Sequence, residues 1–176
     1  LSLALNYASG GLDVRGYHLV NIATHLVCAL LLFGLVRRTL ELPAARPLFR
    51  SPPANIALAV AILWALHPLN TEVVDYLTQR TESLMAAFYL LTLYAAARAA
   101  HGEDRSGRRW RALAVTACAA GMACKESMVT APLVVILYDR AFVFDSMGSA
   151  FRMRWKWYLC LVSTWALLGL LMWSGP

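Results

Sequence analysis

Charged residues are scarce in this sequence. Lysine, arginine, aspartate and glutamate together make up 15% of its 176 residues, whereas hydrophobic residues make up 60%. The mean hydropathy is +0.56. A soluble domain of this length could not hide so much apolar surface from water, but a bilayer solvates it. The composition therefore excludes an ordinary soluble domain and predicts an integral membrane protein.

Several motifs that carry enzyme chemistry are missing. The sequence has no glycine-rich phosphate loop, nucleophile elbow, HExxH zinc motif or internal repeat. The sequence does not indicate which cofactor, if any, the protein uses, and no metal site is expected. The four cysteines lie inside apolar segments without a CxxC spacing, so we interpret them as buried small hydrophobic residues: Cys28, Cys118, Cys124 and Cys160.

The two ends of the sequence do not resemble natural termini. Leu-Ser-Leu-Ala-Leu-Asn-Tyr has no initiator methionine, basic region or cleavage signature. We therefore expect residue 1 to lie inside a larger protein, and the closing Trp-Ser-Gly-Pro to follow a membrane span directly.

The apolar segments predict an all-α fold. Backbone groups in lipid must be satisfied within the segment, which favours helices. We expect a polytopic transmembrane bundle of about six helices, in one domain over residues 1–176, with spans near 17–36, 54–69, 82–98, 110–125, 126–142 and 157–174. The fourth and fifth have two interpretations: two spans that turn at Lys125-Glu126, or a buried hairpin that does not cross. Small residues such as Ala119, Ala120 and Gly121 are expected at helix contacts.

Basic residues are distributed unevenly between the expected loops. If the helices alternate, the segments 37–54, 98–111 and 139–156 share one side and hold 13 of the 16 basic residues, leaving Arg15, Arg80 and Lys125 on the other. The positive-inside rule makes the first side cytoplasmic and the other periplasmic or luminal. The basic residues lack the interleaved aromatics of a single-strand binder, so no nucleic-acid partner is expected.

The segment His67–Glu82 is unusually polar for a connection between two apolar helices. Ionisable groups at a membrane boundary are costly unless they are paired or solvated. One interpretation is an amphipathic helix whose charges pair or meet water. The other makes Arg80 a fork for a phosphate at the bilayer surface, because guanidinium geometry suits that anion. Lys125-Glu126, expected on the same side, either neutralise each other or belong to the same site.

A polar stripe runs along the first expected span. His18, Asn21 and His25 recur at spacings of three and four and therefore share one helix face. Such stripes are usually interhelical hydrogen bonds. A metal site would need a further ligand from another helix, which the sequence does not supply.

These blocks together resemble a known family. Gly16-Tyr17-His18-Leu19-Val20-Asn21 with Thr24-His25-Leu26, then His67-Pro68 with Thr71-Glu72, Tyr76, Arg80 and Glu82, then Lys125-Glu126 before Pro132 and Tyr138-Asp139, resemble the membrane domain of the transmembrane and tetratricopeptide-repeat glycosyltransferases. The resemblance runs from about Asn6 to Phe142. That family is similar to the protein O-mannosyltransferases and belongs to the GT-C class.

The resemblance implies a function and a site. GT-C enzymes take a sugar from a polyprenyl-phosphate carrier on the luminal or periplasmic face. Arg80 and Lys125 would hold the lipid phosphate, and His67, Glu72 and Glu126 would line the site. The acid proposed as general base lies in an earlier loop of that class. Asp13 is the only acid in the corresponding piece here, and its surroundings are more typical of a connector.

Three functions follow as hypotheses. The first is a GT-C glycosyltransferase, or a piece of one without its catalytic acid, that acts on a protein or lipid acceptor. The second is a non-catalytic subunit that uses this fold as a scaffold in a larger membrane complex. The third, a transporter, would need discontinuous helices or an inverted repeat, and only Lys125-Glu126 hints at one. The expected location is an integral membrane position in a bacterial inner membrane, among membrane lipids and other subunits.

Overall fold

The computed structural model describes residues 2–11, 13–70, 79–100 and 105–174. These residues form α-helices and short 3-10 helices, and none of them forms a β-strand. The all-α prediction is therefore confirmed. The α-helices are α1 (Ser2–Gly10), α2 (Val14–Glu41), α3 (Pro53–Ala65), α5 (Arg80–Ala100), α6 (Arg105–Met122), α7 (Ala131–Phe142), α8 (Met147–Val162) and α9 (Thr164–Ser174).

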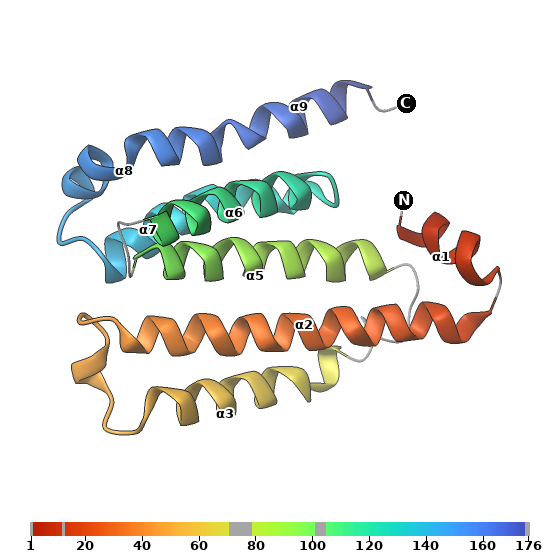
Figure 1. Cartoon of the computed structure of the whole chain (residues 1–176), viewed down its shortest axis with the longest axis horizontal. Coiled ribbons are helices and arrows are strands. Elements are labelled where there is room, and N and C mark those ends of the chain that lie inside the picture. Colours follow the sequence, from red (N-terminus) through yellow and green to blue (C-terminus); the bar gives the residue numbers. More distant parts are fainter. Residues whose placement is uncertain (1, 12, 71–78, 101–104, 175–176) are drawn as a thin grey trace.

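The helices form successive layers of rods (Figure 1). α2 packs between α3 and α5, and α5 packs in turn against α6. The helices α6 and α7 form a hairpin, with the 3-10 helix η4 (Glu126–Thr130) at its turn, and α8 and α9 form the outermost layer. Both interpretations of residues 110–142 predict a hairpin, so its shape alone does not choose between two spans and a buried loop.

Three helices in the described part of the chain have the length and composition to cross a membrane. They are Val14–Glu41, Arg80–Ala100 and the continuous stretch Met147–Trp173. The first two contain the expected spans 17–36 and 82–98, and the third contains all but the last residue of the expected span 157–174. α3 has 13 residues, or about 20 Å at ~1.5 Å per residue, which is shorter than a hydrocarbon core of about 30 Å. Crossing at 54–69, 110–125 and 126–142 stays a prediction.

The three basic segments gather at one end of the bundle, but much of each is helical. The last turns of α2, α5 and α7 and the first turns of α6 and α8 meet there (Figure 1). α2 continues through Arg37 and Arg38 because both side chains pair with Glu41, at 2.9 and 3.1 Å. Such pairs three and four residues apart support the last helical turn. The interpretation of 37–54, 98–111 and 139–156 as loops throughout is wrong.

Small side chains bring α5 and α6 close together. Ala95 and Ala96 of α5 and Ala114 and Cys118 of α6 are fully buried in the main core. Gly121 is buried against Met128, as expected. Ala119 and Ala120 are only half-buried, because they lie to one side of that contact face.

The cysteine prediction holds for two of four residues. Cys28 and Cys118 are buried, whereas Cys124 is half-buried and Cys160 is exposed. The interpretation of Cys160 as buried is wrong, because it lies on the outward face of α8. All four are free thiols.

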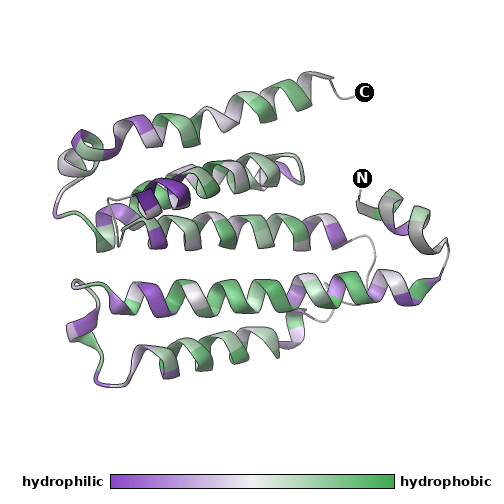
Figure 2. Ribbon diagram, in the orientation of Figure 1, coloured by the Kyte–Doolittle hydropathy of each residue, from purple (hydrophilic) through white to green (hydrophobic). Residues whose placement is uncertain are grey.

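Apolar side chains also cover much of the outer surface. Figure 2 shows hydrophobic residues along the middle of α2 and α3 and hydrophilic residues near the helix ends. Leu30 of α2 and Leu63 of α3 are 69% and 72% exposed. A bilayer stabilises such a surface, which agrees with an integral membrane protein.

Candidate functional site

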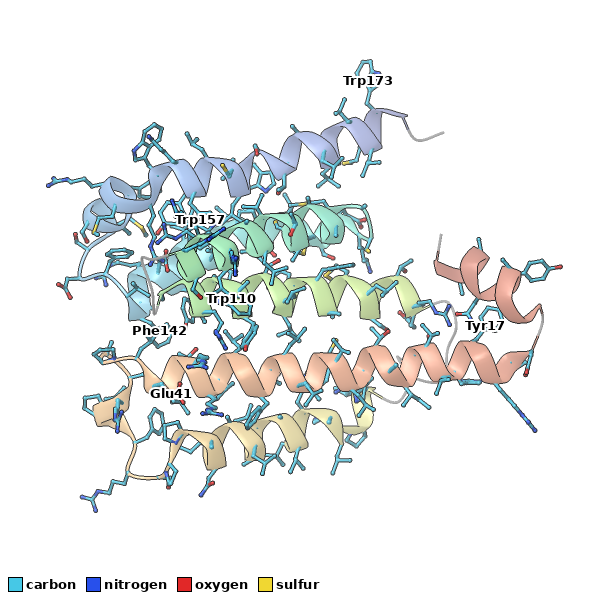
Figure 3. The ribbon with its side chains drawn as sticks, viewed as in Figure 1. Tyr17, Glu41, Trp110, Phe142, Trp157 and Trp173 are labelled. Carbon is cyan, nitrogen blue, oxygen red and sulfur yellow. The ribbon has the colours of Figure 1, made fainter. Side chains whose placement is uncertain are left out.

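Arg80, Glu82, Lys125 and Glu126 lie at the end opposite the basic segments. The start of α5, the junction of α1 and α2, and the turn of the α6–α7 hairpin are all found there (Figure 1). In Figure 3, Tyr17 marks this end, while Glu41 and Phe142 mark the basic end. We call the group Arg80, Glu82 and Lys125, with the hydrogen-bond partners of Arg80, the Arg80 cluster.

Arg80 joins three helices at the start of α5. Its Nε donates to Asn21 Oδ1 at 3.0 Å, Nη1 to Asn6 Oδ1 at 2.8 Å, and Nη2 to the Tyr17 carbonyl at 2.8 Å. The Tyr17 ring lies 5.4 Å from the guanidinium carbon. A buried charge is costly unless it is hydrogen-bonded, and these partners compensate part of that cost.

The guanidinium is covered rather than open. Arg80 has a relative exposure of 1%. The sequence predicts that Arg80 faces a cavity open to lipid headgroups; among the described residues, Asn6, Asn21 and Tyr17 instead close over it. The three hydrogen-bond partners that the described residues supply are neutral, so they leave its positive charge in place.

The short helix α1 reaches Arg80 through a tight turn. Gly11 has φ of 61°, a conformation that side chains other than glycine rarely adopt. The Tyr17 hydroxyl donates to the Gly11 carbonyl at 3.0 Å, and Asp13 caps α2 by accepting from the backbone N–H of Arg15 at 3.0 Å. Asp13 thus has a structural task in the connector, which agrees with the sequence interpretation.

Lys125 reaches the same helix end from the hairpin turn. Its Nζ donates to Glu82 Oε1 at 2.5 Å. The hydrogen bond to Glu82 raises the pKa of Lys125 above its usual range, and burial lowers it less. The charges of Glu82 and Glu126 raise it further. Lys125 is therefore cationic at neutral pH.

The structure brings the two polar segments together through Glu82, which lies two residues beyond Arg80. Arg80 is predicted to lie within reach of Glu72 or Lys125-Glu126. Among the described residues, Lys125 pairs with Glu82, and Arg80 turns toward α1 and α2. Glu126 starts η4 and is exposed. Glu72 lies outside the described residues.

His67 belongs to a local turn after α3. It is exposed, and its Nδ1 accepts from the backbone N–H of Leu69 at 3.3 Å. The Asn70 amide donates to the Trp64 carbonyl at 2.5 Å. Among the described residues, no contact connects His67 to Arg80 or Lys125.

The polar stripe on α2 makes interhelical hydrogen bonds. His25 Nε2 lies 3.0 Å from the Ala65 carbonyl, and its ring stacks on Trp64 at 5.0 Å. Asn21 accepts from Arg80, and His18 is half-buried. No group of three or more metal-ligating side chains is found among the described residues.

A second buried polar cluster lies at the basic end, and sequence reasoning missed it. Asp139 of α7 is completely buried and accepts from Arg154 Nη1 at 2.9 Å to each carboxylate oxygen. The Tyr158 hydroxyl donates to the same carboxylate at 2.6 Å. Arg154 and Tyr158 are four residues apart and share a face of α8. That spacing was a usable signal, but Arg154 was assigned to a solvated loop.

Comparisons with known proteins find matches over most of the chain. The family model described as dolichyl-phosphate-mannose-protein mannosyltransferase matches residues 10–173. The protein O-mannosyl-transferase Tmtc1 of Drosophila melanogaster is 37% identical over 141 residues, which cover 79% of this chain and 15% of the relative. The human protein O-mannosyl-transferase TMTC4 is 32% identical over 142 residues, covering 74% of this chain and 18% of the relative.

A third relative has a similar identity and coverage. The protein O-mannosyl-transferase Tmtc2 of Drosophila melanogaster is 37% identical over 143 residues, or 79% of this chain and 14% of the relative. The chain thus spans 14% to 18% of the length of these relatives. No solved structure matches it.

Proposed function

Because the chain belongs to the dolichyl-phosphate-mannose-protein mannosyltransferase family, we propose that it contributes to the membrane domain of a GT-C glycosyltransferase. The sugar donor is a polyprenyl-phosphate sugar, and the acceptor is a hydroxyl group of a protein. A lipid acceptor is the less favoured choice, because the relatives are named as protein O-mannosyl-transferases. The family match over residues 10–173 is the observation that carries the proposal.

The reaction sets two chemical requirements. The bond between the anomeric carbon and the phosphate oxygen breaks, and a bond from that carbon to the acceptor oxygen forms. The polyprenyl phosphate leaves with the electron pair, and the acceptor hydroxyl loses its proton. A base must take this proton, and cations must stabilise the departing phosphate. We assign no base in this chain.

The Arg80 cluster is the candidate for the second requirement. Arg80 keeps its positive charge among the neutral partners Asn6, Asn21 and Tyr17, and Lys125 adds a second cation at the same end. A guanidinium fixed by its neighbours needs no reorganisation when an anion forms beside it. In this proposal Arg80 and Lys125 stabilise the lipid phosphate, with His67, Glu72 and Glu126 near it.

The orientation of the bundle is part of the proposal. The basic end faces the cytoplasm, because cytoplasmic loops carry an excess of arginine and lysine. The Arg80 cluster then faces the lumen or the periplasm. The relatives named above come from animals, so they give no support to the expected bacterial inner membrane.

Cysteine labelling tests the orientation. Ser106 is the second residue of α6, at the basic end, and Ser127 lies in the hairpin turn at the opposite end; both are exposed. A membrane-impermeant thiol reagent applied from the non-cytoplasmic side is expected to label Ser127→Cys and to miss Ser106→Cys. The reverse pattern would overturn the orientation.

A non-catalytic scaffold is the second candidate function, and one observation favours it. Arg80 is closed off and hydrogen-bonded to α1 and α2, as in a purely structural tie between helices. In that case the chain holds other subunits of a membrane complex together and moves no sugar.

Turnover of the intact protein separates the two candidates. Arg80→Lys keeps a positive charge but removes the fork. Asn21→Ala is the matched control, because it breaks the same tie from the other side and leaves the guanidinium in place. We expect Arg80→Lys to lower turnover on the order of a hundredfold, as loss of one charge-stabilising group does, while Asn21→Ala lowers it much less at similar thermal stability.

Two results would contradict the enzymatic assignment of Arg80. If the two variants lose turnover in proportion to their loss of stability, Arg80 acts as a structural tie. If Arg80→Lys has full turnover, the phosphate is held elsewhere.

A further inference from the structure

A groove of about 440 Å³ lies between α2 and α5 at the basic end of the bundle. Its apolar part is lined by Val27, Leu30 and Leu31, and its polar part by Arg37, Arg38 and Arg98. We call it the α2–α5 groove. It is far from the Arg80 cluster along α2, and the proposed transfer reaction does not use it.

The polar part of the α2–α5 groove carries a net positive charge. Arg37 and Arg38 share the single carboxylate of Glu41. Arg98 donates to the Tyr94 hydroxyl at 3.2 Å, and its guanidinium lies 4.5 Å from the centre of the Trp110 ring. Among these side chains, three cations thus face one anion. Arg98 is held in place by two aromatic rings, which fixes a charge without cancelling it.

The dimensions of the groove fit one leaflet of a bilayer. Val27 and Arg37 are ten residues apart on one helix, a rise of about 15 Å. Half of a hydrocarbon core is also about 15 Å. An acyl chain beside Val27 and Leu30 therefore places its headgroup at the level of Arg37 and Arg38.

A glycine shapes one wall of the groove. A Cβ atom on Gly34 would lie 2.7 Å from Cε2 of Tyr94, which is too close for any side chain. The absence of a side chain lets the Tyr94 ring pack directly on the α2 backbone. The groove is thus bounded by a fixed aromatic ring, whose position also sets that of Arg98.

We propose that the α2–α5 groove binds a diacyl phospholipid with an anionic headgroup. The apolar part takes an acyl chain, and the three guanidinium groups bind the phosphate and its extra negative charge. Arginine forms paired hydrogen bonds with phosphate oxygens, and its charge attracts anionic lipids more strongly than zwitterionic ones. This inference does not depend on the proposed transferase activity.

Lipid retention by the intact protein tests the proposal. The protein is purified in mild detergent, mixed with phosphatidylglycerol or phosphatidylcholine, and weighed with its bound lipids by native mass spectrometry. We expect phosphatidylglycerol to be retained in preference. Replacing both Arg37 and Arg38 by glutamine should weaken that retention on the order of tenfold, because two cations near a lipid surface are lost.

The matched control removes two charges at the same end outside the groove. Arg46 and Arg50 are exposed and line a different cavity, so Arg46→Gln with Arg50→Gln should retain the lipid. Leu30→Trp keeps every charge and fills the apolar part, and it should also lower retention. This variant protects the test against misfolding of the arginine double variant.

Four results would overturn the proposal. They are equal retention of the two lipids, an equal loss in the Arg46 and Arg50 control, no effect of Leu30→Trp, and displacement of the lipid by millimolar inorganic phosphate. The last result would mean that the arginines bind phosphate without using the apolar part.

Discussion

The described part of the chain buries two arginine side chains, one at each end of the bundle, and gives them different partners. Arg154 at the basic end pairs with the carboxylate of Asp139. Arg80 at the other end hydrogen-bonds two side-chain amides and a backbone carbonyl. The first charge is neutralised by its partner, whereas the second has only neutral hydrogen-bond partners among residues 2–11, 13–70, 79–100 and 105–174.

This difference separates two tasks for the same residue type. A buried arginine that serves packing alone is best neutralised, because an uncompensated charge is costly in a low-dielectric interior. An arginine that must stabilise a passing anion has to keep its charge while it is held still. Arg154 fits the first description, and Arg80 fits the second.

Removing the cation at the neutralised site should have the largest effect on stability. Arg154→Gln leaves the Asp139 carboxylate buried without its counter-charge, which typically costs about 3–5 kcal/mol. The measurement is thermal unfolding of the purified protein in detergent. Arg152→Gln is the control, because Arg152 is exposed on the same helix and its loss should leave stability within about 0.5 kcal/mol.

The same measurement can contradict the ion-pair description. If Arg154→Gln is as stable as Arg152→Gln, Asp139 does not need its cation, and the contrast between the two ends disappears. A joint replacement by Asp139→Leu and Arg154→Met should recover much of the loss, since apolar residues of similar volume often substitute for a buried pair.

Removing Asn21, a hydrogen-bond partner of Arg80, should lower stability less than Arg154→Gln does. Asn21→Ala removes one hydrogen bond to a charged group, worth about 1.5–3 kcal/mol. Two bonds, to Asn6 and Tyr17, stay in place and limit the damage. Thermal unfolding compared with Thr24→Ala, a neighbouring α2 residue whose hydroxyl bonds its own helix, checks this expectation. A loss above that of Arg154→Gln would reverse the order of the two sites.

Giving Arg80 a carboxylate partner, as Arg154 has in Asp139, should separate the effect on stability from the effect on function. Asn21→Asp places a carboxylate where the amide accepts from Arg80 at 3.0 Å. The attraction gained and the desolvation of the new charge should largely cancel, so stability is expected to stay within about 1–2 kcal/mol of the wild type. Binding of the polyprenyl-phosphate sugar should weaken clearly, because the guanidinium is now neutralised.

The donor-binding measurement carries its own control. Asn21→Gln keeps an amide without adding charge, and its effect on binding shows how much shape matters. Equal affinities of the Asp and Gln variants for the sugar donor would mean that the charge of Arg80 does not act on the phosphate.

The sequence predicted the helices better than it predicted their polar contacts. Apolar length and charge spacing located α2, α5 and the last span, because the bilayer requires about 20 apolar residues per crossing. The partners of Arg80 were not predictable, since Asn6 and Asn21 meet it only after α1 folds back at Gly11. Arg154 was wrongly assigned to a solvated loop. In the sequence, a single charged residue near a helix end looks the same whether water solvates it or another helix supplies its partner.

The smallest expected effect comes from the pair of Lys125 and Glu82, whose side chains are 33% and 48% exposed. Water and salt screen such pairs, so raising the salt from about 0.1 M to about 1 M should erase any stability difference between the wild type and Lys125→Gln. In the folded protein the pKa of Lys125 is raised, chiefly by its hydrogen bond to Glu82. The contribution of the Lys125 cation is therefore fully present at neutral pH, which is below the ordinary lysine pKa, and it is lost as the pH rises through that raised value.

Exchanging the two charges decides whether Lys125 acts on the phosphate as well as on Glu82. The double variant Glu82→Lys with Lys125→Glu keeps an ion pair across α5 and the hairpin turn but moves the cation from the turn to the helix. If the pair is only structural, the double variant keeps both stability and affinity for the polyprenyl-phosphate sugar. If Lys125 belongs to the phosphate site, the double variant keeps its stability but loses affinity for the polyprenyl-phosphate sugar, because the cation no longer lies in the hairpin turn. Measuring unfolding and sugar-donor binding on the same preparation keeps these two outcomes apart.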